Sequence, residues 1–143
     1  MSLLSACFGV ANTGGKFNNK TGQSGYNSSG GEHGTGGKAV NALSTELIVT
    51  TSREGIKETS IFSKGILLEE KSEIIDKEKH GTTVQFIPDK EIFETVKFDI
   101  EKIKNMIQEF SFLCKGLSFI LKDEITSFQT TYLSENGLYD YID

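Results

Sequence analysis

Glycine is distributed unevenly along this chain, and its distribution limits which part of the chain can form a packed core. Ten of the 15 glycines lie between Gly9 and Gly37. The other residues of that stretch are largely Asn, Ser and Thr, and its charged residues are Lys16, Lys20 and Glu32. Such a composition buries too little apolar surface to offset the entropy lost on ordering. The stretch is therefore either a flexible linker or a long functional loop.

From Lys38 onward the sequence is that of an α+β domain. Short runs rich in β-branched and aromatic residues predict strands over 46–51, 57–62, 66–70, 82–87, 118–122 and 127–132. A short helix is expected over 38–44, directly after the glycines. Apolar residues at three- and four-residue steps predict a second helix from about Asp99 to Cys114, whose apolar stripe packs against the sheet.

Length and charge exclude several classes of protein. A chain of 143 residues suffices for one domain, and no apolar run reaches the roughly 20 residues that cross a bilayer. The net charge of -5 argues against a surface that grips DNA. Cys7 and Cys114 form no CxxC motif, and two thiols make no disulfide framework, so we expect a reducing cytoplasm.

The glycines that precede Lys38 have the form of an anion site, because backbone N–H groups at a helix start can bind phosphate oxygens. A P-loop does not fit, since Glu32 takes the place of its first glycine and Ala39 that of its hydroxyl residue. The dinucleotide fingerprint fits only loosely as Gly34, Gly36 and Ala39, because no strand comes directly before it.

A third version of such a loop matches more specifically. The run from Ser29 to Gly36 (SGGEHGTG), followed by VNALS from Val40 to Ser44, resembles the ATP lid and following helix of GHKL ATPase domains in bacterial type IIA topoisomerases. Two further runs resemble the same family in the same order, GGKF over 14–17 and GTTVQFIP over 81–88. The resemblance extends from about Leu4 to the C-terminus.

The resemblance implies a Bergerat-type two-layer sandwich, with a mostly antiparallel sheet packed on helices and the N-terminal part of the domain missing. Residues 1–37 would be the glycine-rich ATP-lid segment and 38–143 the rest of the domain. The implied phosphate-binding residues are Lys16, Gly31, His33, Gly34, Thr35 and Gly36. Thr82 would lie on the adenine side, through a water shared with an aspartate.

Three residues near this site need separate interpretation. His33 could instead bond to nearby backbone, and Asn41 is expected to be a packing or capping residue. Glu32 departs from the family pattern and would weaken anion binding by like-charge repulsion unless Lys16 or Lys38 offsets it.

The parent protein implied by the resemblance is an ATP-hydrolysing type II topoisomerase that uses ATP and Mg²⁺. It would contact DNA through other domains, pair with an A-type subunit and form a homodimer through its ATPase domain. The family's general-base Glu, Mg²⁺-binding Asn and adenine-binding Asp precede the lid, and no Asp occurs here before Asp76. The chain alone is therefore expected to be inactive, with no catalytic or metal-binding residue of its own.

Two alternatives remain open. One is a non-catalytic nucleotide-binding or protein-interaction module built on the same fold, and the other is a degenerate ATPase that has lost its adenine site. As part of an ATPase domain, the chain lacks the upstream strand and helix that normally cover part of the sheet, and it is expected to hide the exposed surface by self-association.

Overall fold

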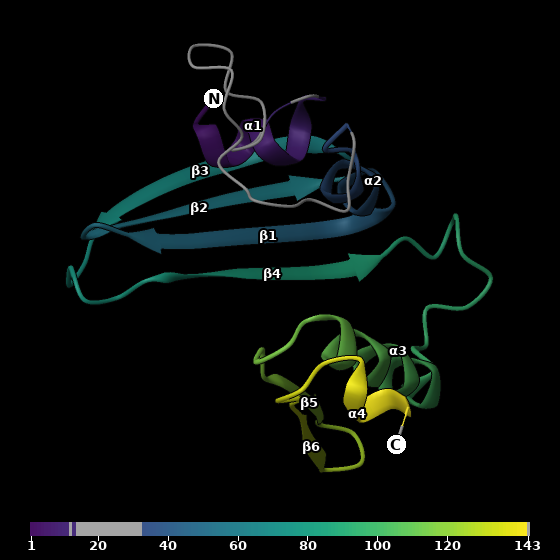
Figure 1. Ribbon diagram of the computed structural model, residues 1–143. Coiled ribbons are helices and arrows are strands. Elements are labelled where there is room, and N and C mark those ends of the chain that lie inside the picture. Colours follow the sequence, from purple (N-terminus) through teal and green to yellow (C-terminus); the bar gives the residue numbers. More distant parts are fainter. Residues whose placement is uncertain (12, 14–32, 143) are drawn as a thin grey trace. The chain divides into compact units, whose positions relative to one another are not determined.

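Four antiparallel strands form the larger sheet of the protein, in the order β3-β2-β1-β4 (Figure 1). In the computed structural model, which describes residues 1–11, 13 and 33–142, the strands are β1 (Ser44–Arg53), β2 (Ile56–Ser63), β3 (Ile66–Ile74) and β4 (Gly81–Pro88). All four strands were expected from their β-branched runs, and β3 continues four residues beyond its expected end at residue 70.

Two-residue turns connect the first three strands. Glu54 and Gly55 join β1 to β2 with φ angles of 54° and 81°, and Lys64 and Gly65 join β2 to β3 with φ angles of 50° and 83°. Positive φ at both central residues is the geometry that matches the right-handed twist of the flanking strands, and glycine adopts it at little cost. β1 and β2 thus form an antiparallel hairpin across Arg53-Glu54-Gly55.

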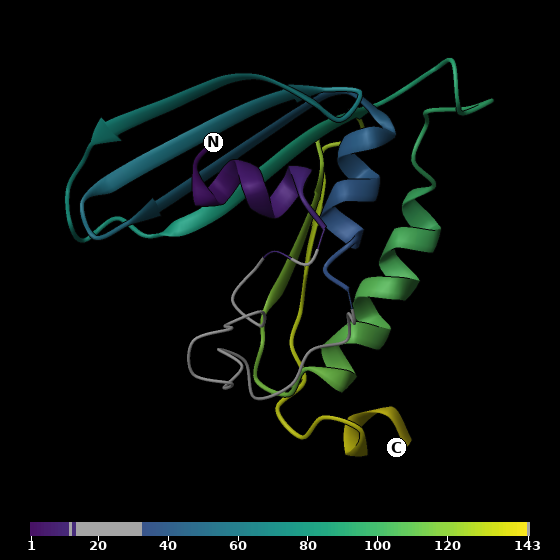
Figure 2. The same ribbon diagram turned by 90° about the horizontal axis from the view of Figure 1, so that it is seen from above.

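Helices α1 (Leu3–Gly9) and α2 (Gly36–Ala42) cover one face of this sheet (Figures 1 and 2). Leu4 of α1 and three strand residues, Leu47, Val49 and Phe62, form the buried core. Phe8 and Leu67 pack against it. Removing side chains of this kind from a core typically costs about 2–5 kcal/mol, so this small cluster fixes α1 on the sheet.

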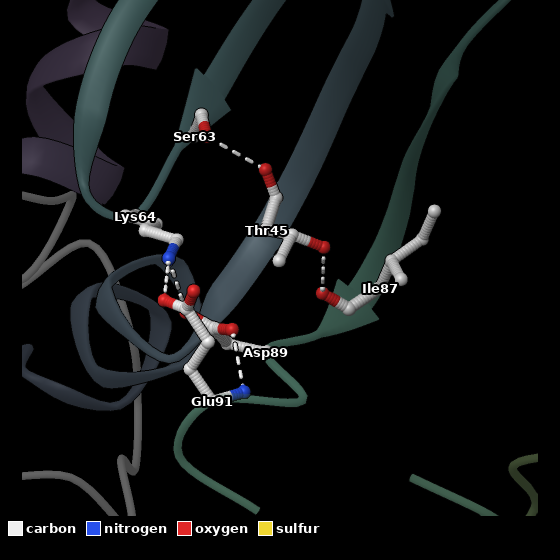
Figure 3. A network of polar contacts seen from close by, with 6 residues as sticks. All are labelled: Thr45, Ser63, Lys64, Ile87, Asp89 and Glu91. Carbon is white, nitrogen blue, oxygen red and sulfur yellow. Dashed lines mark hydrogen bonds and ion pairs between the residues drawn. The ribbon is translucent and has the colours of Figure 1, made fainter.

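A buried acidic residue closes the end of the sheet at which β4 finishes (Figure 3). The carboxylate of Asp89 accepts a hydrogen bond from the backbone N–H of Glu91 at 3.0 Å, and it lies 3.0 Å from the ammonium of Lys64. These contacts, the N–H of Glu91 first, hold the pKa of Asp89 below its usual value. Hydrogen bonds from Ser63 to Thr45 and from Thr45 to Ile87 tie β2, β1 and β4 together beside it.

Residues Lys97–Asp143 form a second compact unit, separate from Met1–Val96. It contains α3 (Ile100–Leu113), β5 (Phe119–Asp123), β6 (Phe128–Tyr132) and α4 (Tyr139–Ile142). The boundary expected from the sequence, between residues 37 and 38, falls inside the first of these two units. The division there into a glycine-rich lid segment and the rest of the domain stays a prediction. None of the described helices is long and apolar enough to cross a membrane.

Within the second unit α3 packs on the hairpin of β5 and β6. The carboxylate of Asp99 caps the helix by accepting from the N–H of Lys102 at 3.2 Å. The ammonium of Lys104 lies 4.3 Å from the ring centre of Phe128, a cation–π contact between helix and hairpin. The helix was expected over 99–114 and is confirmed as 100–113 with its apolar stripe only partly buried.

Candidate functional site

The glycine turn that precedes α2 is described from His33 onward. Gly34 has a φ of 61°, and Thr35 occupies the N-cap position of α2 without a capping hydrogen bond from its side chain. The first helical hydrogen bond runs from the N–H of Ala39 to the carbonyl of Thr35 at 2.9 Å. The N–H groups before it, from Gly36 onward, have no acceptor within the helix, as at any helix start.

The backbone at this turn can be approached closely. His33, Thr35 and Gly36 are exposed. A methyl group built on Gly36 meets no atom of the described residues within 4 Å, whereas one on Gly37 lies 3.2 Å from the ring of Phe8. Gly36 therefore faces open space, and Gly37 allows α2 to approach α1.

Side chains of α2 bind the end of α1. The ammonium of Lys38 donates to the carbonyl of Cys7 at 2.7 Å and to that of Gly34 at 2.5 Å. The side-chain amide of Asn41 donates to the carbonyl of Phe8 at 3.1 Å, in line with the expected packing or capping role. Its buried Oδ1 has no hydrogen-bond partner among the described residues.

Thr82 lies on the face of the sheet that the helices cover. It pairs with Thr51 of β1, two steps along the strand from the pair of Val84 with the buried Val49. Side chains two residues apart in a strand share a face. The hydroxyl of Thr82 is exposed and lies 3.3 Å from that of Thr51.

Not every predicted residue can be placed. Lys16, Gly31 and Glu32 lie outside the described residues, so their assigned roles stay predictions. Lys38 donates to two neutral carbonyls. Its role as a counter-charge to Glu32 stays a prediction, because Glu32 is among the residues that are not described. His80 is exposed, with Nδ1 3.2 Å from the carbonyl of Glu78. Among residues 1–11, 13 and 33–142 no group of three or more His, Cys, Asp or Glu side chains could hold a metal.

Sequence reasoning missed α1 and the contacts it makes. Its signals are weak but present, because Leu4 and Phe8 are four residues apart and Ser2 can cap the helix. The Ser2 hydroxyl accepts from the N–H of Ser5 at 3.1 Å. The bond from Lys38 to Cys7 joins residues 31 positions apart, with a long glycine-rich stretch between them, so spacing in the sequence gives no hint of it.

Comparison with curated proteins shows similarity over nearly the whole chain. The B subunit of DNA gyrase from Haloferax volcanii is 41% identical over 138 residues, which are 94% of this chain and 21% of that protein. Its Helicobacter pylori counterpart is 40% identical over 93% of the chain. The B subunit of DNA topoisomerase 4 from Mycoplasma pneumoniae is 35% identical over 100% of the chain and 22% of its own length. No family model matches.

Solved structures give the same result. The ATP-binding domain of Francisella tularensis topoisomerase IV, solved with a small-molecule inhibitor, aligns with a TM-score of 0.69 at 35% identity over 80% of this chain and 34% of that one. The 43K ATPase domain of Thermus thermophilus gyrase B, solved with an aminocoumarin, has the same TM-score at 32% identity over 73% of this chain and 30% of that one.

The antiparallel sheet packed on helices and these alignments make the chain similar to part of one class of protein, the GHKL-type ATPase domains of type II topoisomerases. Within that class the chain is homologous to a segment of the B subunits of DNA gyrase and topoisomerase IV. It spans about a fifth of the length of the curated relatives it matches.

Proposed function

We propose that this chain supplies the phosphate side of an ATP site in the B subunit of a type II topoisomerase. The observation that carries the proposal is the Gly34–Gly36 turn, which opens into the uncapped start of α2 in a chain homologous to gyrase B. Backbone N–H groups at such a turn suit phosphate oxygens, because the partial positive charge of a helix start attracts anions.

The described residues fit that ligand. Gly36 leaves room for close approach, and the side chain of Thr35 makes no capping hydrogen bond to the N–H groups that follow it. His33 and Thr35 are exposed at the same turn. Lys16 and Gly31 belong to the proposed set by the family pattern alone. ATP brings Mg²⁺ with it, and the charge of that ion would offset the negative charge of the phosphates.

Thr82 is proposed for the adenine side. Its exposed hydroxyl lies on the helix-covered face of the sheet, as a nucleotide between sheet and helices requires. The Thr51 hydroxyl, 3.3 Å away, holds it by a hydrogen bond. The hydroxyl of Thr82 would face a water or the base, and the hydroxyl of Thr51 would stay within the sheet.

The activity of the whole protein is inferred from the relatives. We propose that it couples ATP binding and dimerisation of its ATPase domains to passage of one DNA segment through another. It would act in the cytoplasm with an A-type subunit, and DNA would be held by other domains. Both the net charge of -5 and the open turn before α2 suit a nucleotide-binding part better than a DNA-binding one.

The 143-residue polypeptide alone is proposed to bind ATP weakly and not to hydrolyse it. The family pattern assigns the general base, the metal-binding Asn and the adenine-binding Asp to positions before the lid, and the first Asp of this sequence is Asp76. Loss of a general base alone typically costs about 10²- to 10⁴-fold in rate.

Calorimetric titration with a non-hydrolysable ATP analogue and Mg²⁺ tests this proposal. We expect little or no heat from the 143-residue chain. The matched experiment uses full-length gyrase B in which residues 33–36 and 82 of this chain replace their counterparts, and this chimera should keep micromolar binding. If the chimera fails to bind while it remains folded, the phosphate and adenine assignments are wrong. Saturable micromolar binding by the short chain would instead favour a self-standing nucleotide-binding module.

A further inference from the structure

Lys38 joins two parts of the chain that the long glycine-rich stretch separates. It is the third residue of α2, and its half-buried ammonium donates to the carbonyl of Cys7 in α1 at 2.7 Å. The same ammonium donates to the carbonyl of Gly34 at 2.5 Å, in the turn before its own helix. One side chain thus bridges the end of α1 and the glycine turn.

Asn41 strengthens the first half of this bridge. It lies three residues after Lys38, on the same side of α2, and its side chain donates to the carbonyl of Phe8 at 3.1 Å. The last carbonyls of a helix accept no hydrogen bond from within the helix, and they carry a partial negative charge. Two side chains of α2 therefore satisfy two successive carbonyls at the end of α1, which fixes the position of Lys38 itself.

The second half of the bridge orients a peptide group. In a planar trans peptide the carbonyl of one residue and the N–H of the next point in opposite directions. Because the Gly34 carbonyl is bonded to the Lys38 ammonium, the N–H of Thr35 is directed away from that ammonium.

We propose that Lys38 is a positioning residue that turns the N–H of Thr35 outward to receive an anionic oxygen of the ligand. The inference rests on the proposed function, because it takes a phosphate group as the ligand at this turn. The two bonded carbonyls are neutral and leave the positive charge of Lys38 in place, and that charge also favours an anion nearby.

The test uses isotope-labelled 143-residue chain and three variants. Lys38→Met removes the donors and the charge, and Lys38→Arg keeps both. Lys79→Met, at an exposed lysine between β3 and β4, removes the same charge elsewhere. Residual dipolar couplings report the direction of the Thr35 N–H without any ligand, and titration with inorganic tripolyphosphate reports anion binding through the shift of the Thr35 amide signal.

We expect Lys38→Met to change the Thr35 coupling and to speed amide exchange near both Val10 and Thr35. Its tripolyphosphate affinity should fall by about tenfold or more, as for loss of a hydrogen bond to a charged group. Lys38→Arg should recover most of the coupling and of the affinity, and Lys79→Met should match the unmodified chain except for a small charge effect.

The two ideas fail separately. If Lys38→Met leaves the Thr35 coupling and both exchange rates as they are in Lys79→Met, the positioning role is wrong, whatever binds. If the unmodified chain gives no tripolyphosphate response while Lys38→Met still reorients the Thr35 N–H, the positioning role stands and the phosphate assignment for this chain is wrong.

Discussion

The ammonium of Lys64, in the turn between β2 and β3, lies 3.0 Å from the buried carboxylate of Asp89, just beyond the end of β4. In the sheet β1 lies between β2 and β4. The ion pair therefore joins the residues that follow the two strands on either side of β1. Glu91 binds the same ammonium, and it is the first cause of the raised pKa of Lys64, with Asp89 second. The pair thus closes the end of the sheet where α2 leads into β1.

Replacing Lys64 with Met should destabilise this end of the sheet, because Asp89 would keep the Glu91 N–H but lose its cation. We expect the melting temperature to fall by on the order of 5 °C, measured by circular dichroism. Lys102→Met serves as the control, since Lys102 is exposed and lies 3.8 Å from Asp99, and surface pairs contribute little. An equal fall in melting temperature in the two variants would show that the ion pair of Lys64 with Asp89 stabilises the protein no more than a surface pair does.

Acid should weaken the attachment of α1 through Glu70. Hydrogen bonds from Ser5 first, and from the Ser2 N–H at 2.6 Å, lower the pKa of Glu70 to about 2. The folded pKa lies below the ordinary value of 4.5, so this stabilisation is complete above about pH 4.5. It is lost as the pH falls from there towards 2.

Urea unfolding midpoints measured between pH 7 and pH 2.5 test this. Glu70→Gln should be less stable than the unmodified chain at pH 7, and the difference should shrink below pH 4.5 as Glu70 takes up its proton. Glu94→Gln, at an exposed position, should follow the unmodified chain throughout. A gap between Glu70→Gln and the unmodified chain that stays constant with pH would contradict the role of the Glu70 carboxylate.

Most of the sheet could be predicted from the sequence because its information is local. β-Branched runs and X-Gly turns at Gly55 and Gly65 determine β1, β2 and β3 without any distant contact. The end of β3 was missed because Lys71, Ser72 and Glu73 have no apolar pattern. Pairing with β2, which matches Glu73 with Lys57, keeps those residues in the strand.

The candidate site was predictable only in part, because some of its features follow from sequence patterns and others only from tertiary packing. The glycine turn before Lys38 is a local pattern, and the family resemblance assigned Thr82 at a distance. The bond of Lys38 to Cys7 and the contact of Gly37 with Phe8 depend on how α1 packs against α2. Tertiary contacts of this kind leave no periodic signal in a single sequence.

Neighbouring glycines at the start of α2 should respond differently to the same substitution. Gly36→Ala places a methyl group in open space and should stabilise the protein by about 0.5–1 kcal/mol through helix propensity. Gly37→Ala places it 3.2 Å from Phe8, so the ring must move and that gain should be offset or reversed. Denaturant unfolding of both variants measures the difference. A Gly37→Ala variant as stable as Gly36→Ala would show that the Phe8 ring of α1 moves aside at little cost in free energy.

The two outer strands of the sheet differ in how they are protected from pairing with another chain. β3 carries four charged residues, Glu69, Glu70, Lys71 and Glu73, whereas β4 carries none from Gly81 to Pro88. Among the described residues β4 pairs only with β1. Charged side chains on an edge strand oppose further pairing, and their absence favours it. We therefore expect the chain to self-associate through β4.

Light scattering at increasing concentration should show the mass rising from 15.7 kDa towards that of a dimer. Val84→Lys puts a charge in the middle of β4, at a side chain that is 46% exposed, and should return the mass to that of a monomer. Ile74→Lys, at the exposed end of β3, makes the same kind of change on the other outer strand and should leave association intact. If Ile74→Lys dissociates the protein and Val84→Lys does not, the contact lies on β3, and a mass that stays at 15.7 kDa at every concentration rules out both edges.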